Sequence, residues 1–118
     1  MKQEEILILI PKIEKYIEYM LNVILKLPRT EKFNIGNEYK VSMYRLLANA
    51  IYINKVGNKL GYLNTIDAEL VLERIYLRLM LKNRWIDEKK FKVSIELISE
   101  IGKIVGGLIK YYAKNDKK

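Results

Sequence analysis

The first part of the chain carries apolar residues at alternating spacings of four and three. Because an α-helix turns once in 3.6 residues, this spacing puts them on one face and predicts a helix over about residues 3 to 26. The residues of this face are Ile6, Ile10, Ile13, Ile17, Met20, Ile24 and Leu27. Pro11 either kinks this helix or marks its true start, since proline cannot donate to the preceding turn. Pro28 ends the helix, because it disfavours helical geometry in the residue before it.

Three further stretches show helical periodicity. They predict helices over about residues 35 to 55, 64 or 65 to 82, and 87 to 112. Thr65 and Asp87 are the expected N-terminal caps of the last two helices. The predicted core face of the last helix, which Ile101 and Leu108 widen, consists of Phe91, Ile95, Ile98, Gly102, Val105, Ile109 and Tyr112. The polar tail over residues 113 to 118 is expected to be frayed.

Four helices of similar length favour one architecture. Helices of about 20 residues span ~30 Å, and antiparallel packing lets each bury its apolar face against its neighbours. No strand-like alternation of apolar and polar residues competes with this interpretation. We therefore predict one all-α domain over residues 1–118, folded as an antiparallel up-down four-helix bundle.

Composition excludes several kinds of site. The 118 residues contain no cysteine and no histidine, so disulfides, thiolate metal sites and the usual general base are excluded. The HEPN ribonucleases are helical bundles whose catalytic arginine needs a histidine a few residues later, and Arg74, Arg78 and Arg84 have none. We therefore expect no catalytic residue, no metal and no cofactor. No signal peptide and no apolar run of ~20 residues is visible, so we expect a soluble cytoplasmic protein with no membrane partner.

The net charge of +8 is unevenly distributed. Residues 1 to 26 carry four basic and four acidic side chains, whereas residues 27 to 118 carry 18 basic and 10 acidic ones. A field of this sign attracts anionic partners, above all nucleic acid. The alternative is that the charge serves only solubility.

Basic residues on the third predicted helix lie in a row. Arg74, Arg78 and Lys82 are spaced at i, i+4 and i+8, so they share one face and can follow a phosphate backbone. Alternatively, Glu69 and Glu73 pair with the two arginines on the helix surface. The full set of candidate nucleic-acid-binding residues is Arg45, Arg74, Arg78, Lys82 and Arg84.

Three other features bear on partners. Among nine tyrosines, Tyr44, Tyr52 and Tyr76 are candidates for stacking on unpaired bases, although packing at helix interfaces explains tyrosines equally well. Glycines at 102, 106 and 107 favour close helix packing, within the bundle or between subunits. The third helix is apolar over more than one core face, which indicates a second buried side. Its apolar residues are Leu70, Leu72, Ile75, Leu77 and Leu79.

An ordered set of short segments resembles one small family. The segments are Pro28-Arg29 with Phe33 and Gly36, then Arg45-Leu46-Leu47, then Leu77-Arg78-Leu79, and finally Glu100-Ile101-Gly102 with Gly106-Gly107. They resemble the accessory variability determinant proteins of diversity-generating retroelements and their relatives encoded in bacterial rRNA intervening sequences. Leu27 and Leu108 depart from the family pattern, which commonly has phenylalanine and tryptophan there.

The resemblance implies a four-helix bundle that assembles as a barrel-shaped homopentamer. It also implies binding to a reverse transcriptase and to template RNA or DNA during mutagenic reverse transcription. By resemblance, this role falls on Arg45, Arg74 and Arg78, with Lys82 and Arg84 as weaker additions. The alternative is a structural or protein-interaction bundle of the intervening-sequence type with no nucleic-acid role.

Overall fold

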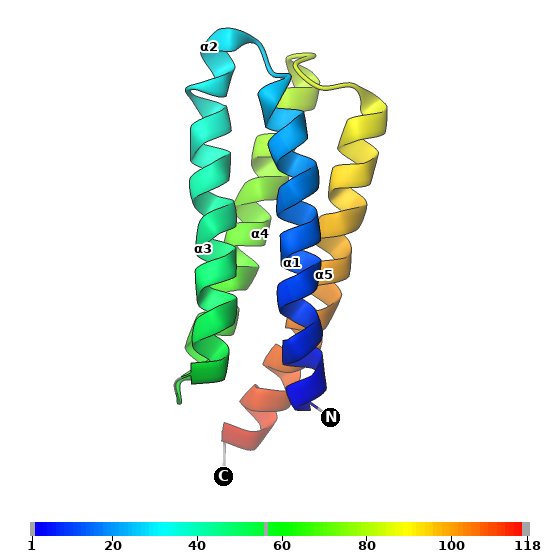
Figure 1. Ribbon diagram of the computed structural model, residues 1–118. Helices are drawn as coiled ribbons and strands as arrows, with labels where there is room; N and C mark the ends of the chain where they lie inside the picture. The colour runs from blue at the N-terminus through cyan, green and yellow to red at the C-terminus, as the bar shows by residue number, and fades with distance from the viewer. Residues whose placement is uncertain (1, 56, 117–118) are drawn as a thin grey trace.

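Four long helices and one short turn of helix make up the fold (Figure 1). The computed structural model describes the backbone of residues 2–55 and 57–116, and the side chains of residues 6–55 and 57–114. The elements are α1 (Lys2–Leu25), α2 (Arg29–Lys32), α3 (Ile35–Lys55), α4 (Lys59–Lys82) and α5 (Glu88–Asp116). The described residues form no β-strand, so the predicted all-α class is confirmed.

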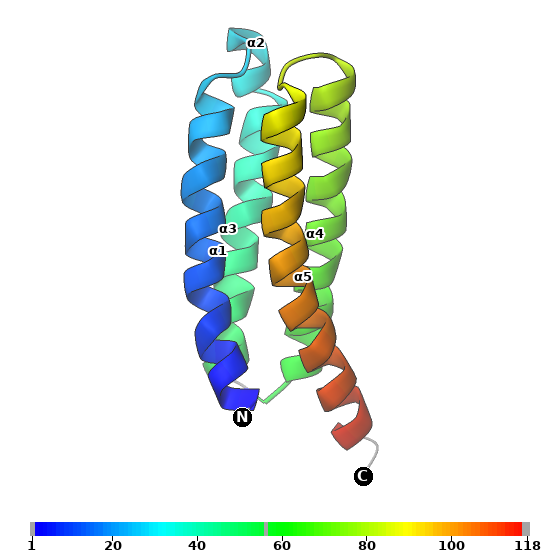
Figure 2. The same ribbon diagram turned by 90° about the vertical axis from the view of Figure 1, so that its right-hand side faces the viewer.

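The long helices alternate in direction and surround one core. Along the ring, α1 packs against α3, α3 against α4, α4 against α5, and α5 returns to α1. The resulting bundle is elongated, with extents of 50 × 22 × 21 Å (Figures 1 and 2). One end carries α2 and the loop between α4 and α5, and both Lys2 and Asp116 lie toward the other end.

The structure settles where α1 begins and moves the start of α4. Helix α1 runs through Pro11, so this proline does not mark its start. Helix α4 begins at Lys59, before the predicted start at residue 64 or 65, because the Asn58 side chain caps it by accepting a hydrogen bond from the Gly61 amide at 3.1 Å. Thr65 lies inside the helix, where its hydroxyl donates to the Gly61 carbonyl at 3.1 Å.

The last helix is capped as predicted but is longer. The Asp87 carboxylate accepts a hydrogen bond from the Lys90 amide at 2.8 Å, which confirms the cap. Helix α5 continues to Asp116, so residues 113 to 116 are helical, beyond the predicted end at residue 112. The last two residues of the tail, 117 and 118, lie outside the described part of the chain.

The core confirms the predicted face of α1 and corrects that of α5. All residues of the predicted α1 face are buried except Ile10, which is partly buried. On α5 the fully buried positions were all predicted except Ser94, but the buried side is turned toward Ile101 and Leu108, because this helix packs between α1 and α4. They are Ser94, Ile98, Ile101, Val105 and Leu108, whereas Phe91, Ile95, Gly102, Ile109 and Tyr112 are only partly buried.

Gly102 and Gly106 of α5 are not needed for packing within the chain. A Cβ at position 102 would lie 3.4 Å from the Arg74 guanidinium, an ordinary contact, and one at position 106 would meet no atom within 4 Å. The prediction of close packing within the bundle is therefore wrong for these two glycines. Gly36, at the start of α3, is different, since a Cβ there would lie 3.0 Å from Ile24 Cγ2 and 3.2 Å from the Glu31 carbonyl oxygen.

Candidate nucleic-acid interface and buried polar network

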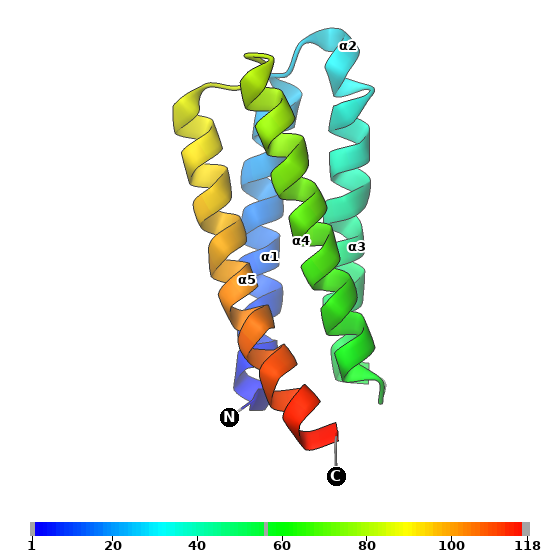
Figure 3. The same ribbon diagram turned by 180° about the vertical axis from the view of Figure 1, so that it is seen from behind.

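The basic row on α4 lies along the side of this helix nearest α5. Arg74 is half-buried, with its guanidinium beside Gly102 of α5, and Arg78 and Lys82 are exposed. Figure 3 shows α4 between α3 and α5. The helical rise separates successive members of the row by about 6 Å. The structure thus brings together three of the five candidate residues.

Neither glutamate that could neutralise the row does so. Glu69 is bound by Arg45 of α3, and Glu73 is fully buried between the helices. No ion pair reaches Arg74 or Arg78 from any described residue. The alternative of surface pairs between these arginines and the two glutamates is therefore wrong.

The other two candidates lie away from the row. Arg45 lies on α3 and forms an ion pair with Glu69, with 2.7 Å between Nε and Oε2. Arg84 follows the end of α4 in a left-handed conformation, with φ of 62°, and is exposed. Arg45 is thus partly neutralised, and Arg84 belongs to the end of the bundle rather than to its side.

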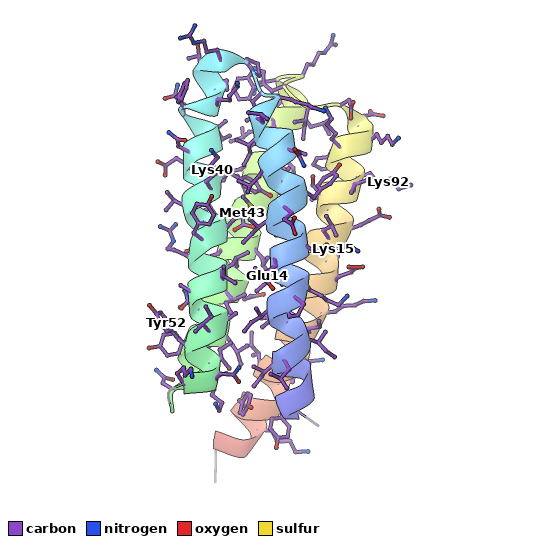
Figure 4. The ribbon with its side chains drawn as sticks, in the orientation of Figure 1. Glu14, Lys15, Lys40, Met43, Tyr52 and Lys92 are labelled. Carbon is purple, nitrogen blue, oxygen red and sulfur yellow. The ribbon has the colours of Figure 1, made fainter. Side chains whose placement is uncertain are left out.

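The three candidate stacking tyrosines have different environments. Tyr44 and Tyr52 on α3 are half-exposed, and Figure 4 shows Tyr52 pointing away from the bundle. The Tyr52 ring contacts that of Tyr62, with 5.3 Å between centroids. Tyr76 is partly buried and packs on Tyr39, with 6.1 Å between the ring centroids, so it contributes to the helix interface.

A chain of hydrogen bonds crosses the middle of the core. It was not predicted from the sequence. Its inner part joins three helices through Tyr16 of α1, Tyr39 of α3 and Glu73 of α4, all fully buried. The two tyrosine hydroxyls are hydrogen-bonded to each other, and the Tyr16 hydroxyl donates to Glu73 Oε1 at 2.7 Å. Burial raises the pKa of both tyrosines well above the ordinary value, so both keep their protons.

The outer part of this network leads to the surface. The Ser42 hydroxyl lies 2.5 Å from Glu73 Oε2 and 2.7 Å from Glu69 Oε1. Glu69 in turn accepts two hydrogen bonds from Arg45, at 2.7 and 3.3 Å, and the Arg45 side chain is half-exposed. Burial raises the pKa of Glu69, but the hydrogen bonds from Arg45 and Ser42 outweigh it and lower this pKa below its ordinary value.

The number of protons in the network links the charge state of Glu73 to the direction of one hydrogen bond. Ser42 has one hydroxyl proton and therefore can donate to only one of the two carboxyl groups beside it. When Ser42 donates to the ionised Glu69, Glu73 holds a proton on Oε2 and donates it to Ser42; when Glu73 is ionised, Ser42 donates to Glu73 instead. Desolvation by burial raises the pKa of Glu73 to about 7, although the hydrogen bonds from Ser42 and Tyr16 oppose the shift. Every polar atom of the network then has a partner, and no buried side-chain polar atom among the described residues lacks one.

The sequence does contain a signal for this network. Glu73 lies three residues after Leu70 and four before Leu77, so it occupies a core position in a seam of otherwise apolar residues. A carboxylate in such a position requires buried hydrogen-bond donors on facing helices. Tyr16, Tyr39 and Glu73 have no exposed surface, so they cannot touch a substrate, and the network acts on folding and helix register.

A second face of α4 is apolar and is exposed in the single chain, so the predicted second buried side stays a prediction. Val71, Ile75 and Leu79 are 48%, 39% and 43% exposed and share a spacing of four residues. Helix α3 adds Val41, Tyr44 and Ile51, which are also exposed. Several exposed apolar side chains on one helix face are typical of protein interfaces.

Two kinds of site are not found in the described residues. No group of three or more acidic side chains there is arranged to hold a metal ion. None of the helices is both long enough and apolar enough to cross a bilayer, as far as the described residues show.

Comparison with known proteins places the chain in a family. One solved structure with a similar fold is a protein of unknown function from the S23 ribosomal protein family of Bacteroides thetaiotaomicron; the TM-score is 0.82 at 15% identity, over 90% of this chain and 98% of that chain. No curated protein matches the sequence. The model of the bAvd-like family matches residues 7–112, nearly the whole chain, and this confirms the resemblance expected from the sequence. The protein therefore belongs to the bAvd-like family.

Proposed function

We propose that this protein is a non-enzymatic cytoplasmic accessory protein that binds RNA or DNA beside a reverse transcriptase during mutagenic reverse transcription. The family match and the net charge of +8 support the proposal. The observation that carries it is the row of Arg74, Arg78 and Lys82, whose neighbouring carboxylates are engaged elsewhere. An unpaired basic row on the outside of a helix is arranged for contact with phosphates.

The chemistry of the row favours binding to the backbone over reading of sequence. Guanidinium groups form two parallel hydrogen bonds to phosphate oxygens, and a spacing of about 6 Å lets successive side chains contact successive phosphates. Contacts with phosphates carry no sequence information. We therefore expect weakly specific binding with a strong salt dependence.

The test is fluorescence anisotropy with a labelled structured RNA over a series of salt concentrations. The affinity of the unmodified protein should fall steeply with salt, by a factor set by the number of phosphates contacted. The double variant R74E/R78E should lose binding and keep its helical circular dichroism. Its matched control, K103E/K110E, makes the same change in net charge at exposed positions of α5 and should retain most of the binding. Binding that is absent or insensitive to salt would refute the proposal.

A second candidate function is a structural or protein-interaction module. The exposed apolar residues Val71, Ile75 and Leu79 favour it, because they offer a surface for another protein or a second copy of the chain. We further propose assembly into a homopentamer, as the family resemblance implies, in which repeated subunits would multiply weak phosphate contacts. Light scattering coupled to size exclusion, with and without RNA, separates the candidates: an oligomer that ignores RNA supports the interaction module alone.

A further inference from the structure

Most of the excess positive charge lies at one end of the bundle. This end is formed by residues 26–33, with α2, and by residues 82–92, which connect α4 to α5 (Figure 2). These two segments contain eight basic and three acidic residues, a net +5 of the total +8. A single-stranded nucleic acid that approaches the protein is therefore attracted to this end as well as to the side of α4.

A small cavity opens at this end between α1, α2 and α3. Its volume is about 260 Å³, which is below the roughly 300–1,000 Å³ of pockets for whole small molecules and suits a smaller fragment. Phe33 lines it and is the most exposed large apolar residue described, at 66%. Leu25, 62% exposed, also lines the cavity. The exposed ring of Phe33 is therefore accessible to a ligand.

The polar groups around Phe33 suit a nucleotide. Lys32 and Lys40 both line the cavity, no carboxylate does, and neither lysine has an ion-pair partner among the described residues. Figure 4 shows Lys40 on the part of α3 nearest this end. The Asn37 amide nitrogen donates to the Phe33 carbonyl at 3.1 Å, which holds the Phe33 backbone and leaves the amide oxygen as an acceptor at the cavity.

We propose that this cavity binds one unpaired nucleotide of a single-stranded nucleic acid, with the base stacked on Phe33 and the flanking phosphates on Lys32 and Lys40. The inference rests on the proposed function and adds a second contact to it. A base exposes its face only when it is unpaired, so the site selects single strands over duplexes. Two lysines and no carboxylate line the cavity. This favours a nucleic acid as the ligand over a protein, whose surface carries charges of both signs. The neighbouring cavity at the same end is lined by Asp87 and Glu88 as well as by basic residues, and it does not share this preference.

The test compares labelled single-stranded oligouridine with a labelled RNA duplex in anisotropy titrations. Phe33→Ala should weaken binding of the single strand by about 5- to 150-fold, the equivalent of the ~1–3 kcal/mol measured per stacked base, and leave the duplex unaffected. Phe33→Trp should restore binding, since it preserves the stacking surface. Tyr111→Ala is the matched control, because it removes another partly exposed aromatic residue, near the end of α5 that lies away from the cavity. The double variant with Lys32→Gln and Lys40→Gln should weaken binding and reduce its salt dependence, whereas Phe33→Ala should leave the salt dependence unchanged.

Each outcome is informative. Suppose that the Phe33→Ala variant binds the single strand as tightly as the unmodified protein does, and that the R74E/R78E variant binds neither the single strand nor the duplex. The nucleotide site is then refuted and the proposed function stands. If the unmodified protein binds neither RNA, both are refuted. If Phe33→Ala changes the particle mass in light scattering and leaves RNA affinity unchanged, the cavity is a contact between copies of the chain, and the nucleotide site is again refuted.

Discussion

The buried carboxyl group of Glu73 predicts an unusual pH dependence of stability. Most carboxyl groups stabilise a fold as the pH rises through their pKa, but Glu73 should do the opposite, because its pKa is raised from 4.5 to about 7 on folding. Below pH 4.5 both the folded and the unfolded states hold the proton, and the contribution to stability is fully present. Between these two pKa values only the folded state holds it, so stability falls as the pH rises.

The size of the effect follows from the shift. One pKa unit corresponds to 1.36 kcal/mol, so a rise from 4.5 to about 7 amounts to about 3 kcal/mol, of which about 2 kcal/mol is lost between pH 5.5 and pH 8.5. This loss is a large share of the 5–15 kcal/mol typical of small domains. It corresponds to a fall of roughly 10 °C in Tm for a chain of this size.

Few other groups of this chain titrate between pH 5.5 and pH 8.5. The chain has no histidine and no cysteine, and ordinary carboxyl groups are ionised by pH 5.5, so besides Glu73 the terminal amine is the group expected to titrate there. Glu73→Gln should abolish the slope, because the glutamine amide can donate to Ser42 and accept from Tyr16 as the protonated acid does. Urea unfolding followed by circular dichroism at closely spaced pH values measures both proteins.

A matched control separates burial from simple loss of charge. Glu96→Gln makes the same chemical change at an exposed position of α5 and should keep the full slope. A Glu73→Gln protein whose stability falls with pH as steeply as that of the unmodified protein would refute the assignment of the proton to Glu73. A flat profile for the unmodified protein would refute it equally.

Other substitutions test the packing and the surface. Gly36→Ala should destabilise the fold by roughly 1–3 kcal/mol in urea unfolding, since its Cβ would lie 3.0 Å from Ile24; an unchanged midpoint would show that the helices move apart easily. Gly106→Ala should stabilise an isolated chain by roughly 0.5–1 kcal/mol, because nothing lies within 4 Å, whereas a smaller particle mass would reveal that subunits pack there. Ile75→Lys, at a position 39% exposed, should leave Tm within a few degrees and reduce the mass seen in light scattering if this face joins subunits; an unchanged mass excludes it.

The bundle could be predicted from the sequence because helical periodicity depends on local spacing. The α1 face was correct because its apolar residues recur at spacings of three and four, and this spacing separates it from the exposed apolar residues Leu7, Ile8 and Leu25. The α5 face was predicted too wide, because the apolar residues at 91, 95 and 109 are only partly buried, and it missed Ser94, because a serine is not expected in a core. Its hydroxyl is satisfied by the Lys90 carbonyl at 2.7 Å, a local bond that composition does not reveal.

The candidate site could be predicted only in part. The row of Arg74, Arg78 and Lys82 follows from spacing on one helix, and the structure places these side chains as expected. The pairing of Arg45 with Glu69 could not be foreseen, because it depends on which helix lies beside which. The same holds for Phe33, whose exposure depends on how α2 packs against α3.

The placement of the chain ends has a practical consequence. Lys2 and Asp116 lie toward one end of the bundle, and α2 with its basic neighbours lies at the other, within a molecule 50 Å long (Figure 1). A surface tether, an affinity tag or a fused fluorescent protein joined at either terminus would therefore be held far from the cavity at Phe33. Immobilised or fused forms of this protein should leave its basic end facing the solution, which suits them to surface-based and single-molecule assays.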